Sequence, residues 1–522
     1  MSIAKPPPAW TDTANPPYSL VMQLKALIPA TSGAMALLLA FTAAAESTIR
    51  LGLASLPNGN GNPFDSSART TWYTFRAFFD ALAQLGDNLQ IEPALAVAWD
   101  NTDDFTWIVT LRDGVTFSNG EPLDAEAALF SYRYLQTDAG ALESLSRDVA
   151  DIVAMEALDE RTIKFVTGIP MPEFPRLLAV VPIVPPRYWE DVGLEGFIFE
   201  PVGTGPFRVT DWRPARIKLE AFRESWRAPK ADKLEILAIP ETAARVAGLL
   251  TDRIDIASEI GPDDAYQVEA AGMVVYQRPA TAIEVIAFNT LIDSPLKDAR
   301  VRQALNYAID KEVIVAAIMD GRTRVADQMT PVINPERVPD LAPYSYDPDK
   351  AKALLADAGY PDGFSFVFEF SFGTGGTHMP SMFQQVAADL KKIGVDMEVR
   401  PLPWSQYVRG VLQGEWGGQA FGFEYEVLPT GSSMRPFRLH SCAWPYPWYC
   451  DETIEPAIAQ AKQEMEPQAR LAAVHEVLRH YHDEAVALLL IENLGIDGVS
   501  PRVEGYSQVN GIIPFHEITV GD

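Results

Sequence analysis

The sequence predicts an α/β protein made of two lobes. Its 522 residues, 48% hydrophobic and 21% charged, can bury more than one ordinary domain core. Predicted strands and helices also follow one another in two separate series, one from about residue 233 and one from about residue 285. Because each series of strands and helices forms a lobe of its own, two α/β lobes follow.

The first series is preceded by a strand near the start of the folded chain. Residues 49–54 alternate as a half-buried strand, and Pro-Asn-Gly-Asn-Gly-Asn-Pro at 57–63 ends it in a polar loop. The apolar character of residues 233–239 predicts a buried strand, followed by a helix at 241–251 and a strand at 254–257. These segments form a strand, helix, strand unit.

The residues between these strands have a different pattern. Residues 107–112 and the turn at Asp113–Gly114 predict a hairpin, and a helix follows from about 124 to 135. Residues 150–184 add short strands and a proline-rich connector. The segment therefore has the style of an α+β insertion.

The second series begins with a strand at 285–288 and a long helix from Asp298. A helix at 348–358 is bounded by its chemistry, because Asp347 suits the N-cap, Pro348 the first turn and Gly359 the left-handed position after the helix. Further elements are predicted at 364–370 (a strand with four alternating Phe), 380–393 (helix), 395–399 (strand), 466–484 (helix) and 485–491 (buried strand).

Residues 1–45 have the pattern of a leader. An apolar run at 34–41 ends at three alanines, a small-x-small pattern that predicts cleavage before Glu46. Met22 is the expected true start. The alternative is a membrane anchor, but the run is short for a bilayer and no basic flank follows it. A soluble protein exported to the periplasm of a Gram-negative type cell is expected.

The net charge limits the classes of binding partner, and the cysteine content limits the kinds of structural or metal site. A net charge of −28 argues against nucleic acid, which needs a surplus of Lys and Arg. The only cysteines, Cys442 and Cys450, lie eight residues apart, and an oxidising compartment would let them pair. A metal pair is the alternative, but two thiolates with this spacing and no close His make a poor zinc site. We therefore expect a disulfide.

Two stretches of the sequence come close to known enzyme or cofactor motifs, but each lacks a required spacing or residue. His475 and His480 are one residue too far apart for a zincin helix. The glycine-rich stretch 373–378 lacks the Lys-Ser/Thr of a P-loop and the spacing of a dinucleotide motif. No catalytic residue, cofactor or metal site is expected, although His378 and His440 leave metal binding open as an alternative.

Four stretches, in order, resemble the peptide, nickel and opine type of solute-binding proteins of ABC importers, solute-binding family 5. They are residues 93–99 leading to 106–107 and 111–123; residues 202–207 with Trp212; residues 288–289 with Leu296 and 301–310; and residues 347–361. They cover nearly all of the chain after the leader. Their order makes the resemblance specific, although each stretch alone has an ordinary structural explanation.

The resemblance implies a hinged, two-lobed periplasmic-binding-protein fold (type II) with an extra α+β domain inserted in lobe I. Lobe I is expected at 46–66, 200–284 and 490–522, the inserted domain at 67–199 and lobe II at 285–489. A monomer would capture a peptide or peptide-like solute between the lobes, and ABC permease subunits at the inner membrane would recognise the closed state. An opine, an oligosaccharide or a nickel complex is the alternative ligand, and a periplasmic enzyme is the alternative class.

The resemblance also suggests ligand contacts. Peptide-binding relatives carry a Trp-x-x-Asp-x-x-x-Pro segment whose carboxylate holds the ligand ammonium. Here the matching stretch is 421–429, in which a Phe replaces the Trp and Glu424 or Glu426 replaces the Asp. On a strand these two glutamates would share one face, in the cleft or in solvent. The expected contacts are Asn58, Phe117, Asn119, Asn289, Trp404, Phe423, Glu424, Tyr425 and Glu426.

Overall fold

The computed structural model describes residues 46–65, 69–371 and 378–521. The predicted leader, its cleavage point and most of the glycine-rich stretch lie outside the described residues. Residues 46–522 form one compact unit. Within the described ranges, no helix is both long and apolar enough to cross a membrane.

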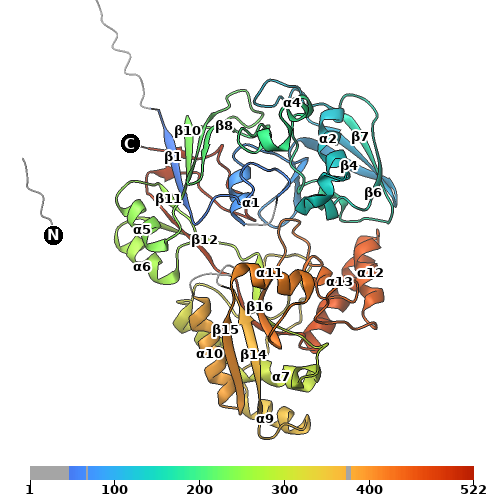
Figure 1. The fold of residues 1–522 in the computed structure, drawn as a ribbon, viewed down its shortest axis with the longest axis vertical. Helices are drawn as coiled ribbons and strands as arrows, with labels where there is room; N and C mark the ends of the chain where they lie inside the picture. The colour runs from blue at the N-terminus through green and yellow to red at the C-terminus, as the bar shows by residue number, and fades with distance from the viewer. Residues whose placement is uncertain (1–45, 66–68, 372–377, 522) are drawn as a thin grey trace, which may run out of the picture. The chain divides into compact units, whose positions relative to one another are not determined.

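A seven-stranded sheet organises the first part of the fold (Figure 1). Its order is β12-β18-β11-β1-β10-β9-β8, and β1 pairs in parallel with β10 and β11. The side chains of Ile49, Leu51 and Leu53 are buried, as the alternation at 49–54 predicts. The strands are β1 (Thr48–Leu53), β8 (Phe207–Arg213), β9 (Arg216–Ala221), β10 (Lys233–Ala238), β11 (Ile256–Ala257), β12 (Val274–Arg278) and β18 (Gly495–Val499).

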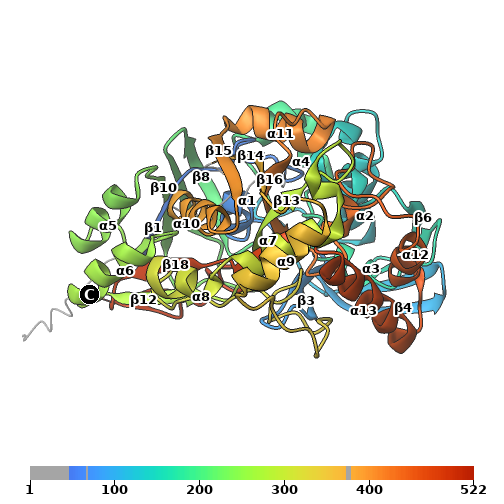
Figure 2. The same cartoon turned by 90° about the horizontal axis from the view of Figure 1, so that it is seen from below.

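Helices α5 (Thr242–Leu250) and α6 (Pro262–Ala270) accompany this sheet. α6 lies beside β12 in Figure 1 and Figure 2. The predicted strand, helix, strand unit is confirmed in β10, α5 and β11, although β11 is shorter than the predicted 254–257.

A four-stranded antiparallel sheet, β4-β5-β7-β6, carries the segment that the sequence marks as α+β. Its strands are β4 (Ala96–Asp103), β5 (Thr106–Leu111), β6 (Ile152–Ala157) and β7 (Thr162–Thr167); its helices are α2 (Ala125–Leu135), α3 (Phe174–Leu177) and α4 (Pro186–Phe197). The hairpin prediction at Asp113–Gly114 is wrong: β5 pairs with β4 and β7, and Asp113–Gly114 leads away toward α2. Polar turn residues fit either connection, so the turn alone did not identify the partner strand.

A five-stranded sheet, β15-β14-β16-β13-β17, organises the second series. Its strands are β13 (Ala282–Phe288), β14 (Phe364–Phe370), β15 (Val395–Pro401), β16 (Ala420–Glu426) and β17 (Ala487–Glu492). Ile286 and Phe288 of β13 pack into one core, and Ile283, Val285 and Ala287 into another. Because both faces of β13 are covered, its whole length is buried.

The helices of this part are α7 (Ala299–Ala308), α8 (Lys311–Val313), α9 (Pro348–Asp357), α10 (Met379–Lys391), α11 (Trp404–Gln413), α12 (Glu455–Gln463) and α13 (Pro467–Asp483). α10 lies beside β15 in Figure 1 and Figure 2. The predicted boundaries of α9 are confirmed, because Asp347 accepts the Lys350 N–H at 2.9 Å and Gly359 has a φ of 92°.

The chain passes twice between the seven-stranded and five-stranded sheets, from β12 to β13 and from β17 to β18. The Asn493 side chain joins the two passages: its Oδ1 accepts from the Thr281 and Ala282 N–H groups at 3.0 and 3.2 Å. The backbone N–H of Asn493 donates to the Ala282 carbonyl at 3.0 Å. The lobe and insertion boundaries expected from the resemblance stay predictions. Short pairs β2 (Ala83–Leu85) with β3 (Ile91–Pro93) and β19 (Val503–Glu504) with β20 (Thr519–Val520) complete the strands described.

Candidate functional site

The expected contacts outside β16 lie in different environments. Asn58 is exposed in a turn, and Asn119 is exposed and bonded to Glu121 at 2.7 Å. Phe117 is fully buried in the core, so it offers no surface to a solute in this structure. Asn289 is half-buried, and its Oδ1 accepts the Leu291 N–H at 3.2 Å. The hydrogen bonds described for Asn119 and Asn289 are local and join neither residue to another of the four.

Trp404 opens α11 with half of its surface exposed, and its ring stacks on Tyr407 with centroids 5.5 Å apart. The Tyr407 hydroxyl donates to the Gly422 carbonyl of β16 at 2.9 Å. This bond ties α11 to the strand that carries the other expected contacts.

The four expected residues of β16 divide by face. Tyr425 is fully buried, and its hydroxyl lies 3.1 Å from His440 Nδ1. Phe423 is half-buried against Trp448, with ring centroids 5.5 Å apart. Glu426 accepts the Leu428 N–H at 3.0 Å and the Thr281 hydroxyl at 3.4 Å, so it supports the local backbone.

Glu424 belongs to a buried electrostatic cluster. It lies directly opposite Glu284 in the antiparallel pairing of β16 and β13. His378 Nε2 lies 3.0 and 3.1 Å from the two Glu284 oxygens, and both side chains are buried. Burial alone would lower the pKa of the His378 imidazole, but the charge and hydrogen bond of Glu284 and the charge of Glu424 raise that pKa above its usual value.

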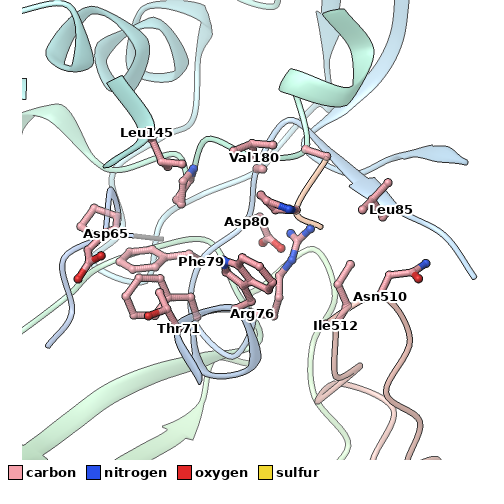
Figure 3. A pocket seen from close by; sticks show the side chains of 18 residues that line it. Asp65, Thr71, Arg76, Phe79, Asp80, Leu85, Leu145, Val180, Asn510 and Ile512 are labelled. Atoms are coloured by element: carbon pink, nitrogen blue, oxygen red, sulfur yellow. The ribbon is translucent and has the colours of Figure 1, made fainter. Parts of the chain in front are cut away.

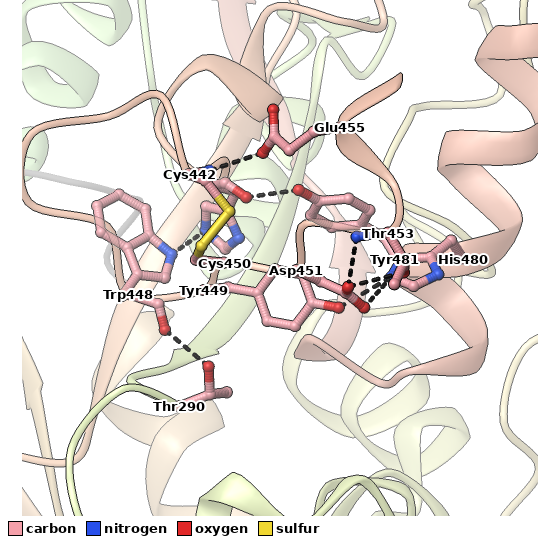
Figure 4. The surroundings of a disulfide bond; sticks show 11 residues. Thr290, Cys442, Trp448, Tyr449, Cys450, Asp451, Thr453, Glu455, His480 and Tyr481 are labelled. Carbon is pink, nitrogen blue, oxygen red and sulfur yellow. Dashed lines mark hydrogen bonds and ion pairs between the residues drawn. A yellow bond between two sulfur atoms is a disulfide. The ribbon is translucent and has the colours of Figure 1, made fainter. Parts of the chain in front are cut away.

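The disulfide between Cys442 and Cys450 is confirmed, and it closes a loop that contains Trp448 and Tyr449 (Figure 4). The Trp448 indole N–H donates to His440 Nε2. Because an indole nitrogen only donates, Nε2 is the acceptor and the proton lies on Nδ1. Burial lowers the pKa of His440 well below its usual value, so the ring is neutral.

Metal binding by the two histidines receives no support from their partners. His378 is paired with Glu284, and His440 is enclosed by Trp448, Tyr425 and Tyr481. In the part of the chain that the structure describes, no three His, Cys, Asp or Glu side chains are placed to hold a metal ion.

A cavity of about 90 Å³ lies among segments that are distant in the sequence (Figure 3). It is bounded by α1 (Arg69–Phe75), the residues that follow it, parts of the α+β segment, Pro429 after β16, and the turn at 510–512. Its lining residues are Pro63, Asp65, Thr71, Trp72, Phe75, Arg76, Phe79, Asp80, Ala81, Leu85, Leu145, Ala179, Val180, Pro182, Pro429, Asn510, Gly511 and Ile512. Most of these side chains are apolar.

The turn at 509–512 is formed by Asn510 and Gly511, which have φ values of 53° and 73°. Val509 and Ile512 exchange both backbone hydrogen bonds, at 3.1 and 2.8 Å. Positive φ at both central residues is the type I′ pattern that Asn-Gly favours. The Asn510 amide nitrogen donates to the Gly86 carbonyl, which holds the turn against the cavity wall.

Asp80 fixes the floor of the cavity. Its Oδ2 accepts from the Thr204 hydroxyl at 2.9 Å and the Trp226 indole at 3.0 Å, and its Oδ1 pairs with Arg227. Burial would raise the pKa of Asp80, but the charges of Arg227 and Arg76 and these hydrogen bonds lower it. Asp80 is therefore a fully engaged carboxylate.

The motif at 202–207 packs beneath this floor. A Cβ on Gly203 would lie 2.1 Å from the Phe78 carbonyl oxygen, and one on Gly205 2.6 Å from the Phe78 Cα. Only glycine permits this approach. The motif thus brings Thr204 to Asp80.

The sequence did not single out Thr71, Arg76 or Asp80. They lie in an apolar and aromatic stretch that has the composition of a core segment. The Asn510–Gly511 dipeptide is a strong turn signal in its own right and could have identified that wall.

The fold matches solved periplasmic binding proteins. A binding protein associated with an ABC transporter from Helicobacter pylori, in complex with the peptide STSA, has a TM-score of 0.77 at 23% identity, covering 91% of this chain and 99% of that one. The likeness defines the class: a mixed α/β, two-lobed and hinged periplasmic-binding-protein fold.

Residues 90–443 match the bacterial extracellular solute-binding proteins, family 5, and the chain belongs to this family. It is 26% identical over 455 residues to a dipeptide-binding protein of Escherichia coli, covering 80% of this chain and 84% of the relative. A glutathione-binding protein of Salmonella typhimurium is 26% identical (85% and 89% covered), and a nickel-binding periplasmic protein of Escherichia coli is 27% identical (84% and 88% covered). The protein is a non-enzymatic solute-binding component of an ABC importer.

Proposed function

We propose that this protein captures a small peptide or peptide-like solute between its lobes and delivers it to the permease subunits of an ABC importer at the inner membrane. One observation carries the proposal. The cavity is lined from one side by α1 and the turn at 510–512, and from another by Pro429, which follows β16 of the five-stranded sheet. A ligand held there contacts both parts of the hinged fold, so it stabilises their closed arrangement.

Several relatives are named for peptide ligands, and one of similar identity is named for nickel. The relatives include a dipeptide-binding and a glutathione-binding protein, and a related fold holds the peptide STSA. Among the expected contacts, Trp404 presents the largest exposed ring surface for stacking on a ligand. Asn58, Phe117, Asn119, Asn289, Phe423, Glu424, Tyr425 and Glu426 stay proposed contacts of the closed state.

A thermal-shift panel tests the ligand class. The purified chain is heated with dipeptides, longer peptides, opines, oligosaccharides and nickel with histidine. A true ligand raises the melting temperature by mass action. A shift with peptides supports the proposal; a shift with an opine, sugar or nickel complex, and none with any peptide, contradicts it.

We further propose that the protein works as a periplasmic monomer released by cleavage before Glu46. N-terminal sequencing of the protein recovered from the periplasm should begin at Glu46, and light scattering should give the mass of one chain. A mature chain that retains residues 22–45 contradicts the cleavage.

A further inference from the structure

The cavity in Figure 3 is too small to enclose a whole ligand. Pockets that enclose small-molecule ligands usually measure roughly 300–1,000 Å³, and this cavity measures about 90 Å³. It therefore suits one end group of a larger solute. The chemistry of its polar lining decides which end group.

Arg76 is the one cation among the lining residues. Its guanidinium makes no ion pair or hydrogen bond within the described ranges, and the nearby carboxylate of Asp80 is already taken by Arg227, Trp226 and Thr204. Burial lowers the pKa of Arg76 to about 10, although the nearby negative charge of Asp80 raises it. The side chain is therefore still a cation at neutral pH. A half-buried cation that feels a nearby carboxylate but makes no direct ion pair with it favours an anionic group beside it.

Among the residues that the structure describes, three other polar atoms of the lining also have no hydrogen-bond partner: Thr71 Oγ1, Trp72 Nε1 and Asn510 Oδ1. The Thr71 side chain is 2% exposed and that of Asn510 is 6% exposed. Buried polar groups are normally paired with protein or with water, so these atoms in the cavity wall are available to bond with whatever enters the cavity. The Thr71 hydroxyl and Trp72 indole can donate, as Arg76 does, whereas Asn510 Oδ1 accepts.

Asp65 is the remaining charged residue of the lining. It has an interaction of its own, and Figure 3 shows it at the far side of the cavity from Asn510. The walls between are apolar, with Phe75, Phe79 and Val180 among them. The cavity thus combines a guanidinium, two neutral donors and a hydrophobic surround with the acceptor Asn510 Oδ1 and the carboxylates of Asp80 and Asp65, of which Asp80 is bound by Arg227, Trp226 and Thr204.

We propose that this cavity is a carboxylate subsite: it takes the carboxylate end of the solute, bound to Arg76, with the adjoining short apolar group against the surrounding aromatic and aliphatic walls. The inference deepens the proposed function, because a peptide C-terminus has this chemistry. The carboxylate of another organic acid has it too, and the experiment separates the two sources.

The first experiment needs no knowledge of the natural ligand. Three probes of similar size are compared by calorimetry and thermal shift on the whole protein: isovalerate, isovaleramide and isoamylamine, which are an anion, a neutral amide and a cation. Isovalerate should bind at least about tenfold more tightly than the amide. Equal binding of acid and amide, preference for the amine, or no response to isovalerate each overturns the proposal.

Variants then assign the effect to Arg76. Arg76→Met should weaken isovalerate binding about tenfold or more and bring acid and amide to similar affinity, whereas Arg76→Lys should keep part of the preference. Arg133→Met, at an exposed arginine of α2, is the matched control and should behave as the wild type. An Arg76→Met variant that keeps the full acid preference overturns the proposal. The wild-type comparison of acid and amide stands even if a variant fails to fold.

A second pair of probes separates this inference from the proposed function. Dipeptides with a free C-terminus are compared with their C-terminal amides. Peptides preferred as free acids support both ideas, and isovalerate binding without peptide binding supports the subsite while contradicting the peptide function. Dipeptides that bind equally as acids and amides contradict the subsite and leave the peptide function standing.

Discussion

His378 shows how one side chain keeps a carboxylate inside a fully covered strand. β13 is buried along its length, and Glu284 in its middle would be a costly unpaired charge without the imidazole 3.0 Å away. Glu424 adds a second carboxylate across the strand pair. The ion pair therefore depends on the protonated form of His378.

Replacing His378 by Gln should destabilise the fold most at acid pH. The pKa of His378 is raised in the folded state, so its stabilisation is fully present below the unfolded value of about 6.5 and is lost as the pH rises through the folded pKa. We expect a loss on the order of 3 kcal/mol near pH 6 that shrinks at higher pH. Urea unfolding between pH 5.5 and 9 measures it.

Glu284→Gln provides the control, because it removes the charge that raises the pKa of His378. In that background, His378→Gln should show no extra cost at acid pH. A cost that stays constant across the pH range in both backgrounds would contradict the pairing.

Arg76 is a residue of the candidate site that could not be predicted from the sequence. Arg76 stands alone in the aromatic stretch from Trp72 to Phe79, and a lone charge there gives no spacing or motif to interpret. Its importance arises because Asp80 is neutralised by Arg227, which lies 147 residues further along the chain.

At the scale of elements, Asp80 joins the segment after α1 to the residues after β9. Asp80→Asn should cost about 3–5 kcal/mol of unfolding free energy at neutral pH, because it leaves the buried Arg227 without a counter-ion. The pKa of Asp80 is lowered, so this stabilisation is present above the unfolded value of about 3.8 and is lost as the pH falls through the folded pKa.

Asp211→Asn is the matched control, since Asp211 pairs with the exposed Arg213 and should cost under about 1 kcal/mol. Denaturant unfolding at pH 7 compares the two. Equal costs would show that the Asp80 pair contributes no more than a surface pair.

The disulfide constrains one loop between β16 and α12. It closes a loop with a sequence separation of 8, for which the chain-entropy relation gives about 2.5 kcal/mol. Replacing both cysteines by Ser should lower the unfolding free energy by about that amount. Because the chain has only these two cysteines, wild-type protein under reductant should match the double variant, and a mismatch would point to another effect of the substitutions.

Elements governed by local chemistry were predictable. The residues that cap α9 are close together in the sequence, and so are the four alternating Phe of β14. The structure confirms both elements. The partner of β5 was mispredicted, because the pairing with β4 and β7 depends on contacts beyond the turn. Register across a sheet is set by such distant contacts.

At the scale of the molecule, the two passages between the large sheets meet at Asn493. Asn493→Ala would remove the acceptor of the Thr281 and Ala282 N–H groups, at an expected cost of about 1–3 kcal/mol. Hydrogen exchange should be faster at both amides. Asn88→Ala, at an exposed turn residue, is the control with an expected cost under about 0.5 kcal/mol. Unchanged exchange at both amides would show that the passages are held by other contacts.

The order of strands in the seven-stranded sheet could not be obtained from pattern alone. β18 from the end of the chain lies between β12 and β11, and β1 lies between β11 and β10. Periodicity identifies the strands, but pairing between residues hundreds apart is fixed by the assembled cores. The resemblance to a known family implied that the start, middle and end of the chain share one lobe, but it gave no strand order.

The turn at Asn510–Gly511 has a consequence during synthesis of the protein. A ribosome makes α1 some 440 residues before it makes this turn, yet both line the same cavity. A growing chain therefore lacks one wall of the subsite until almost its last residues have emerged. In the proposed subsite, recognition of a carboxylate therefore requires the finished polypeptide, and we expect a chain clipped before residue 510 to lose the acid preference.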